Sequence, residues 1–429
     1  FVIFFSFPVN IFNYRYITKN NSFNVNFFQC LSINIIIGLN LFLLYSILNL
    51  KMHTVFIVTI LVAIIFNLFY FKKYFLFFKN NKNEIFKILF FLFLFLSISL
   101  QISANLKLEW DALVHWIFKA INFHEELGIQ SLKDVGFPQY PHLGGYVWGF
   151  FWKNSFLEME YFGRLFFPFF YLVSIFALSE LLIKLNNKIV YVIIFFFCIT
   201  TYDLFLFSGY QEYLLFATLV FSSKILIDLI EIKKINIFLL ILLISSGHLL
   251  IWFKAEGLVY FIVFYTIMSI YLVRGFSLFK AIITITFLVF LQIWIQYKII
   301  GFYGFHFQPG MTHDHLYNLL NYKILFSKLI LITKYIFISF IKYPIWIVNI
   351  FSFLYLYFYN RALLQKFKIF YIILFVNIII IYGIYLHTPY DLEFLLKVTL
   401  DRLLFQTSGF YFIFTILVLN IAFTKNRNI

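Results

Sequence analysis

The chain has 429 residues, 63% of them hydrophobic and only 12% charged, and apolar runs of membrane-spanning length recur along all of it. This composition excludes a soluble globular domain, and the lack of alternation in the apolar runs excludes a transmembrane barrel. The net charge of +15 is interpreted through membrane topology and not as a sign of nucleic-acid binding. Cys30 and Cys198 lie far apart, so we expect neither a disulfide framework nor a zinc site. The sequence predicts an all-α, polytopic membrane protein.

Apolar segments of suitable length predict a bundle of about 12 transmembrane helices. In chain order they cover residues 31–49, 54–70, 88–104, 161–183, 189–207, 213–230, 235–252, 256–273, 281–300, 344–360, 369–386 and 405–423. Phe1–Val9 is typical of the end of a helix, so we expect the first helix to be truncated. We assign residues 1–87 to N-terminal membrane helices and residues 88–429 to a catalytic membrane module.

Lysines and arginines orient these spans, because they favour the cytoplasmic side of short loops. Five lysines fall within residues 71–87, which we therefore place in the cytoplasm together with residues 361–368. The outer side then receives the long loop 105–160 and the loops 301–343 and 387–404. Fourteen of the 18 acidic residues gather on that outer side. They are Glu109, Asp111, Glu125, Glu126, Asp134, Glu158, Glu160, Asp203, Glu212, Glu256, Asp314, Asp391, Glu393 and Asp401.

This alternation requires the apolar stretch 325–341 not to cross the membrane. Four lysines in and beside it fall within an arc of about 140° on a helix, as expected for a helix that lies in the membrane interface. They are Lys323, Lys328, Lys334 and Lys342. A lysine at the centre of a span costs about 2.5–3.5 kcal/mol. We therefore predict an interfacial helix here.

The long outer loop 105–160 is predicted to contain a helix from Ala112 to about Leu127, with Asp111 as a candidate N-cap. Its polar residues recur at helical spacing, and the remaining positions are mostly apolar. The polar stripe consists of His115, Lys119, Asn122 and Glu126. We expect an amphipathic helix on the membrane surface.

Glu109 and Asp111 are the leading candidates for chemistry. They follow an apolar segment directly, so they are expected just outside the bilayer. An extended backbone would place both carboxylates on one face, and a second carboxylate nearby makes the first a stronger base. Asp111 is then a candidate general base, and the pair is an alternative metal or leaving-group site. The structural alternative is a helix cap beside a solvated acid.

Other polar residues at the outer ends of spans are candidates for binding. Glu212 has no basic neighbour in the sequence, and a carboxylate at that depth is costly, so Glu212 is a candidate for function. The alternative is a plain acid at the membrane interface. Lys254 and Glu256 lie between two spans and are close enough to pair with each other. Arg402 has the planar fork that binds phosphate, although an arginine before an apolar run also commonly snorkels.

A metal site has weaker support. His306, His313, Asp314 and His315 contain metal-binding residue types, but His-x-His lacks a third partner nearby. No phosphate-binding glycine loop, Ser–His–Asp signature or zinc-protease motif is present in the sequence. We therefore assign no metal and no cofactor.

Six short motifs, in this order, resemble the GT-C class of polytopic glycosyltransferases, a class that includes bacterial relatives of protein O-mannosyltransferases. The motifs are Glu109-Trp-Asp111, Trp116-Ile-Phe-Lys-Ala120, Tyr140-Pro141, Ser208-Gly-Tyr-Gln-Glu212, Trp252-Phe-Lys-Ala-Glu-Gly257, and Thr388-Pro-Tyr-Asp-Leu392 with Asp401-Arg-Leu-Leu-Phe-Gln406. The resemblance covers about residues 88–423. Glu212 stands where the class commonly has aspartate, and Ala255 where it has asparagine.

The resemblance implies transfer of a sugar from a polyprenyl-phosphate donor to a glycan, lipid or protein acceptor at the outer face of a bacterial inner membrane. It implies that membrane lipids surround the protein and that nucleic acid is not a partner. The implied catalytic residues are Asp111 as general base, with Glu109 and Glu212. The implied substrate-binding residues are Arg402, Lys254, Glu256, His115, Lys119 and Tyr140.

Two other functions stay open. A transporter or flippase for lipid-linked glycans should carry charges near mid-membrane and a repeat that relates its halves, whereas the ionisable residues here cluster at one side. A polymerase or ligase for such glycans would be expected to carry its large loop late in the chain, whereas the longest outer loop here comes early. Convergence of Asp111, Glu212 and Arg402 on one outer cavity would favour the glycosyltransferase.

Overall fold

The computed structural model of the chain describes residues 1–14, 27–138, 140–178, 187–200, 208–231, 236–273, 276–298, 322–388 and 390–425. These residues are almost all helical and include no strand, which confirms the predicted all-α class. The chain divides into two compact units. Unit 1 comprises Phe1–Phe195 and Asp203–Phe302, and unit 2 comprises Phe196–Tyr202 and Tyr303–Ile429. The boundary predicted between residues 87 and 88 lies inside unit 1.

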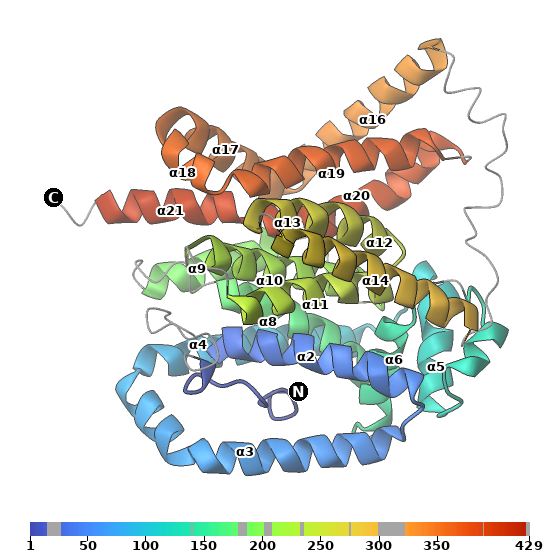
Figure 1. Ribbon diagram of the computed structural model, residues 1–429, viewed down its shortest axis with the longest axis vertical. Coiled ribbons are helices and arrows are strands. Elements are labelled where there is room, and N and C mark those ends of the chain that lie inside the picture. Colours follow the sequence, from blue (N-terminus) through green and yellow to red (C-terminus); the bar gives the residue numbers. More distant parts are fainter. Residues whose placement is uncertain are drawn as a thin grey trace. The chain divides into compact units, whose positions relative to one another are not determined.

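Unit 1 is built around two helices that are buried along almost their whole length. Its helices are α2 (Phe27–Ile47), α3 (Met52–Asn80), α4 (Lys82–Ala104), η1 (Ala112–Trp116), α5 (Ile117–His124), η2 (Gln130–Asp134), α6 (Leu143–Lys153), α7 (Glu160–Arg164), α8 (Phe166–Leu178), the first part of α9 (Asn187–Thr200), α10 (Glu212–Glu231), α11 (Ile237–Phe253), α12 (Glu256–Tyr260), η5 (Phe261–Tyr265), α13 (Thr266–Leu272) and α14 (Phe276–Lys298). The core helices α8 and α10 pack against each other (Figure 1). Helix α2 packs on α8, α11 packs on α10, and α2 and α11 also contact each other.

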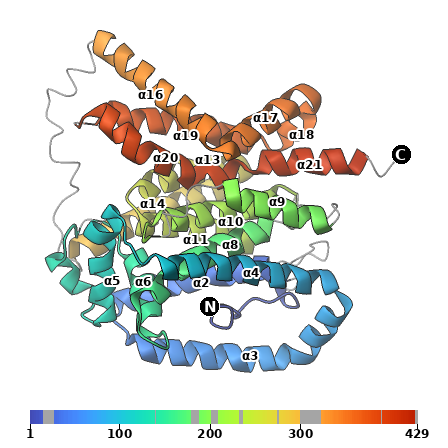
Figure 2. The ribbon, with the colours of Figure 1, turned by 180° about the vertical axis from the view of Figure 1, so that it is seen from behind.

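The peripheral helices of unit 1 have the opposite character. Helix α3 lies at the edge of unit 1 (Figure 2). Only Met52 and Ala63 are buried along its 29 residues, and large apolar side chains such as Phe69 and Leu68 are exposed. An apolar helix that is exposed on this scale requires an apolar surrounding. The exposed apolar surface is therefore the surface that contacts lipid, and the chain is a multi-pass membrane protein.

Nine helices among the described residues are long and apolar enough to cross a membrane. They are Phe27–Ile47, Met52–Asn80, Lys82–Ala104, Glu160–Leu178, Glu212–Glu231, Leu278–Lys298, Tyr322–Lys342, Lys368–Leu386 and Leu392–Ala422. Eight of them coincide with predicted spans, and the ninth is the stretch predicted to lie in the interface. Four further predicted spans are shorter apolar helices of 10–17 residues. The predicted number of spans and the interfacial position of residues 325–341 stay predictions.

Three local predictions were wrong. Phe1–Val9 forms turns and not the end of a helix. Residues 71–87 are not a loop, because α3 continues to Asn80 and α4 begins at Lys82, so that only Asn81 separates them. The predicted loop 387–404 is largely helical, since α20 begins at Leu392 and Asp391 caps it by accepting from the Phe394 N–H at 2.7 Å. In the last two cases the sequence carried helix-forming residues beyond the apolar run that was counted as the span.

Unit 2 contains the remaining helices. They are α16 (Tyr322–Lys342), α17 (Pro344–Tyr359), α18 (Arg361–Lys366), α19 (Lys368–Leu386), α20 (Leu392–Tyr411) and α21 (Ile413–Lys425). Helices α16, α19 and α20 contact one another, and α17 packs on α21. Pro344 begins α17, where its fixed φ suits the first helical turn and its missing N–H costs nothing.

The predicted sidedness can be tested with single cysteines in a chain without Cys30 and Cys198. We expect an impermeant maleimide added to spheroplasts to label Lys133→Cys in the outer loop and to leave Lys79→Cys and Gln365→Cys unlabelled. Residues 133 and 365 are both exposed, so access to the thiol depends on the side of the membrane. Labelling of Gln365→Cys from outside would show that residues 325–341 cross the membrane.

Candidate functional site

Arg164 of α7 fixes the segment that leads to Glu109 and Asp111. Its side chain is fully buried, and it donates to the carbonyl oxygens of Leu106 and Lys107 at 3.3 and 3.4 Å. Its Nε and Nη2 atoms face the Glu160 carboxylate at 2.8 and 3.0 Å. Such a two-point pair fixes orientation as well as distance. Arg164 is therefore a positioning residue, and the i,i+4 spacing from Glu160 was its signal in the sequence.

The backbone at Asp111 is helical and not extended. Asp111 has φ −62° and ψ −37° and makes no capping hydrogen bond, so it is not the predicted N-cap. The helix begins one residue earlier, at Trp110. Glu109 lies before the helix and Asp111 lies within its first turn, so the extended backbone that would place the two carboxylates on one face is absent at Asp111. Glu109 pairs instead with Lys107, with 3.0 Å between Oε1 and Nζ.

The predicted amphipathic helix exists as η1 and α5, but its polar stripe faces the protein. His115, Lys119 and Asn122 are buried, whereas Leu113 and Phe118 on the other face are 48% and 52% exposed. Helix α5 packs closely on α6, where glycines allow the two backbones to approach (Figure 2). We expected an amphipathic helix on the membrane surface, but periodicity identifies a stripe and not what covers it. The protein covers three of the four stripe residues, whereas Glu126 lies beyond the end of α5 and is exposed.

His115 and Tyr140 lie in one aromatic group. The two rings stack with centroids 4.6 Å apart, and Phe137 meets His115 edge-on at 4.3 Å. Lys119 lies against the same group and donates from Nζ to the Tyr140 carbonyl oxygen at 2.5 Å. Its ammonium is also 5.7 Å from the Trp116 ring. Three of the predicted substrate-binding residues, His115, Lys119 and Tyr140, are thus brought together.

Burial lowers the pKa of Lys119 from its ordinary 10.5 to about 7. The folded state therefore holds fewer protons than the unfolded state between about pH 7 and 10.5, so stability should rise with pH across that window. The largest slope from one such group is about 1.4 kcal/mol per pH unit. We expect thermal unfolding in detergent to show this rise, and Lys119→Met to remove it and to be more stable than the wild type below pH 7. Lys133→Met, at an exposed position of the same loop, should keep the wild-type slope; the same slope in Lys119→Met would contradict the assignment.

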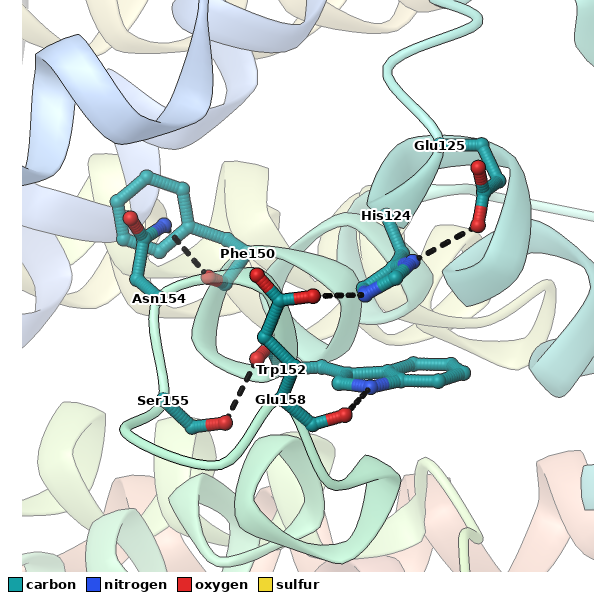
Figure 3. A network of polar contacts seen from close by, with 7 residues as sticks. All are labelled: His124, Glu125, Phe150, Trp152, Asn154, Ser155 and Glu158. Atoms are coloured by element: carbon teal, nitrogen blue, oxygen red, sulfur yellow. Dashed lines mark hydrogen bonds and ion pairs between the residues drawn. The ribbon is translucent and has the colours of Figure 1, made fainter.

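The far end of the same loop is closed by a polar network around His124 (Figure 3). The His124 ring stacks on Trp152 with centroids 4.2 Å apart. Its Nδ1 is 3.1 Å from Glu125 Oε1, and its Nε2 is 4.0 Å from Glu158 Oε2. Trp152 Nε1 donates to the Glu158 carbonyl oxygen at 2.6 Å. The network joins the end of α5 to the turn after α6.

The second predicted acidic motif, Ser208–Glu212, lies against the first. The Glu109 N–H donates to the Ser208 carbonyl oxygen at 3.2 Å. Gly209 has φ +99°, and a Cβ there would lie 2.6 Å from the Cβ of Ala112, so only glycine permits this approach. The chain thus brings two motifs about 100 residues apart in sequence into direct contact.

Glu212 is part of a buried charge cluster. Its side chain is fully inaccessible, and its Oε1 is 2.8 Å from Nζ of Lys254, which is 6% exposed. Lys254 also lies 3.1 Å from Glu256, whose side chain is 28% exposed. The expected Lys254–Glu256 pair is confirmed. Glu212 does have a basic partner, which the sequence did not reveal because 42 residues separate the two.

Gln211 is a neighbour that the sequence analysis did not single out. Its side chain is fully buried, and neither amide atom has a hydrogen-bond partner among the described residues. A Cβ on Gly144 would overlap with its amide oxygen, so the glycine at the start of α6 makes room for this side chain. A buried amide without partners is expected to serve a ligand or a bound water. Gln211 therefore belongs with Glu212 in the site.

Arg402 lies in unit 2, in the middle of α20, and is 9% exposed. The preceding Asp401 accepts from Ser339 Oγ at 2.5 Å and Tyr343 Oη at 3.0 Å, and it pairs with Lys342 at 2.9 Å. The motif that carries Arg402 is thus fixed to α16 within its own unit. Unit 1 holds the other predicted site residues: Asp111, Glu109, Glu212, Lys254, Glu256, His115, Lys119 and Tyr140.

The histidines of the weaker metal hypothesis, His306, His313 and His315, lie outside the described residues together with Asp314. In the part of the chain that the structure describes, no group of three histidine, cysteine or acidic side chains could hold a metal ion. Comparisons with protein-family models, curated proteins and solved structures yield no match for this chain. The arrangement offers partly exposed carboxylates beside a buried, partly neutralised charge cluster, which suits proton transfer next to an anionic group.

Proposed function

We propose that the chain is a GT-C-like glycosyltransferase that uses a polyprenyl-phosphate sugar at the outer face of a bacterial inner membrane. The observation that carries the proposal is the contact between the two acidic motifs, Glu109–Asp111 and Ser208–Glu212, within one unit. The motif Trp252–Gly257 joins them through the Glu212–Lys254 pair. Motifs that are far apart in sequence and meet in one unit are the arrangement expected of an active site.

In the proposed reaction an acceptor hydroxyl attacks the anomeric carbon of the donor sugar. The new C–O bond forms as the bond between that carbon and the phosphate oxygen breaks, and polyprenyl phosphate leaves. Asp111 takes the proton of the acceptor hydroxyl, as a partly exposed carboxylate beside the aqueous side can do. Lys254 would supply positive charge to the leaving phosphate by exchanging one of its two carboxylate partners, Glu212 or Glu256, for a phosphate oxygen.

The apolar surroundings fit a lipid-borne donor. Helices η1 and α5 turn Leu113 and Phe118 outward, so the segment that carries Asp111 has an apolar exposed face. A polyprenyl chain can lie along such a face while its phosphate reaches the polar side. The acceptor, a glycan, lipid or protein, would approach from the aqueous side.

One observation favours the second candidate, a transporter or flippase for lipid-linked glycans. Lys224 and Asp228 form a buried ion pair at 2.7 Å inside α10, and Gln29 of α2 donates to Asp228 at 3.0 Å. Ionisable groups inside a spanning helix commonly mark a transport path. Both members are paired within one helix, which also suits a structural role. A polymerase or ligase is a third candidate only because it would use the same kind of lipid-linked substrate.

Arg402 is proposed to bind the donor phosphate, because its planar fork can make two hydrogen bonds to it. Arg402→Lys keeps the charge but loses this geometry, so we expect donor binding to weaken about tenfold, as follows from losing about 1.4 kcal/mol. Binding of a short-chain polyprenyl-phosphate hexose to the purified protein would measure it. Lys397→Arg, at an exposed position of the same helix, is the matched control. Unchanged donor binding in Arg402→Ala would show that Arg402 does not bind the donor phosphate.

The function is tested in proteoliposomes that carry a labelled polyprenyl-phosphate sugar in one leaflet. The proposal predicts that added acceptor gains the label and that polyprenyl phosphate accumulates. Movement of intact donor between leaflets, with no polyprenyl phosphate formed, would instead identify a flippase.

A further inference from the structure

A small cavity lies apart from the charge cluster of unit 1, where α2 ends, α3 begins and α5 gives way to its following turn. Its volume is about 180 Å³, which is room for about six waters at about 30 Å³ each. Most of its lining side chains end in a hydroxyl, an amide or a charge. These side chains are Tyr45, Ser46, Asn49, Lys51, Glu126 and Tyr146.

The Tyr146 hydroxyl is the feature that points to a ligand. Tyr146 is 2% exposed and lines the cavity, yet its hydroxyl has no hydrogen-bond partner among the described residues. Burial raises the pKa of Tyr146, and the nearby Tyr45 and Glu126 raise it further, so the hydroxyl stays protonated and available as a donor. Buried hydroxyls are nearly always hydrogen-bonded in folded proteins. An unused one in a polar cavity is expected to serve whatever fills it.

The backbone around the cavity is held in an unfavourable conformation. Asn49 and Glu126 have φ of +51° and +57°, and Gly128, which also lines the cavity, has φ +82°. Left-handed backbone is costly for glutamate and tends to persist where a site requires it. Asn122 supports this turn by donating to the Gly128 carbonyl oxygen at 2.8 Å. The Met52 N–H donates to Glu126 Oε1 at 3.2 Å, which links the turn to the start of α3.

The cavity also connects to the candidate functional site through one buried histidine. Ser46 Oγ lies 2.9 Å from Nε2 of His142. The His142 ring meets Trp252 edge-on at 5.4 Å, two residues before Lys254. Burial and the charge of Lys119 lower the pKa of His142 to about 3, so this link is a neutral one. A ligand in the cavity would therefore be separated from the charge cluster by few side chains.

The side chains that line the cavity favour some classes of ligand over others. The Glu126 carboxylate disfavours a phosphate, and a single carboxylate beside the Lys51 ammonium does not make a cation site. Hydroxyls and an amide both donate and accept hydrogen bonds, and the rings of Phe123, Tyr45 and Tyr146 offer apolar faces. A neutral ring that carries several hydroxyl groups satisfies both features, and the volume admits one such ring.

We propose that this cavity binds a single neutral sugar ring and is a distal acceptor subsite, which holds a ring of the acceptor about 20 Å along η1 and α5 from Asp111. The acceptor role rests on the proposed function, whereas sugar binding does not. The Tyr146 hydroxyl and the Glu126 carboxylate are the groups that hold the ring.

Sugar binding is tested on the full-length protein in detergent with the methyl glycosides of glucose, galactose, mannose and N-acetylglucosamine, by saturation-transfer NMR. We expect at least one glycoside to bind, and Tyr146→Phe and Glu126→Gln each to weaken its binding about tenfold, as loss of one hydrogen bond to the ligand implies. Tyr161→Phe and Glu125→Gln, which do not line the cavity, should bind like the wild type. Tyr146→Phe should unfold at the same or a higher temperature, because it removes a buried hydroxyl without a partner.

The two proposals fail in different ways. No binding of any glycoside to the wild type, or equal binding by Tyr146→Phe and Glu126→Gln, overturns the sugar site. Tyr146-dependent binding without sugar transfer from any polyprenyl-phosphate donor supports the sugar site and overturns the acceptor role together with the proposed function. Transfer whose KM for the acceptor rises about tenfold in Tyr146→Phe, with kcat unchanged, supports both.

Discussion

Lys254→Met is expected to destabilise the protein by about 3–5 kcal/mol, the usual cost of removing one member of a buried ion pair. The substitution leaves Glu212 as a fully inaccessible carboxylate that has lost the ammonium 2.8 Å away. The double variant Glu212→Gln/Lys254→Met should recover most of this loss, because it removes both charges. Thermal unfolding in detergent would measure the four corners of this cycle.

Lys298→Met is the matched control, since Lys298 is an exposed lysine at the end of α14. It should change stability by less than about 1 kcal/mol. A double variant as unstable as Lys254→Met alone would show that the two side chains are not coupled. The interaction proposed between Glu212 and Lys254 would then be contradicted.

Asp111→Asn is expected to lower the rate of sugar transfer about 10²- to 10⁴-fold, the usual effect of losing a general base. The amide has nearly the shape of the carboxylate but cannot accept the proton. Loss of a helix cap, which costs about 0.5–2 kcal/mol, should not contribute to the effect, because Asp111 makes no capping hydrogen bond. Donor binding should also be preserved, so the defect should appear in kcat.

Asp134→Asn is the control for Asp111→Asn, because Asp134 is an exposed aspartate at the end of η2 in the same loop. It should transfer sugar at the wild-type rate. If Asp111→Asn retains most of its activity, the base must be sought at Glu109 or Glu212. The variant Glu109→Gln would then be informative, since Glu109 pairs with Lys107, whereas Glu212 pairs with the buried Lys254.

The helices were predictable because apolar length alone specifies a membrane helix, whose backbone groups are satisfied within the helix. The ends of α3 and α20 were not, because both continue through charged residues that a helix tolerates as well as a loop does. The polar stripe of η1 and α5 was found from its period. The direction that the stripe faces depends on packing against α6, and the periodicity of the sequence carries no information about that packing.

The candidate site was predictable in its residues and not in its contacts. The Lys254–Glu256 pair follows from proximity in sequence, and the structure adds Glu212 from 42 residues away. The contact between Glu109 and Ser208 needs a glycine with positive φ at residue 209. The sequence alone does not show which glycine of the chain adopts a positive φ. Three residues were not predicted because only their burial distinguishes them from other residues of the same type. They are Gln211, Arg164 and Tyr146.

The central claim, that this protein transfers a sugar from a polyprenyl phosphate, is tested most directly by single-turnover chemistry. Purified protein in excess over a labelled short-chain polyprenyl-phosphate hexose, with acceptor present, should convert the bound donor to polyprenyl phosphate and labelled product. Asp111→Asn should bind the same amount of donor and leave it intact on that time scale. Donor that binds the wild type and stays intact with every acceptor offered would contradict the account.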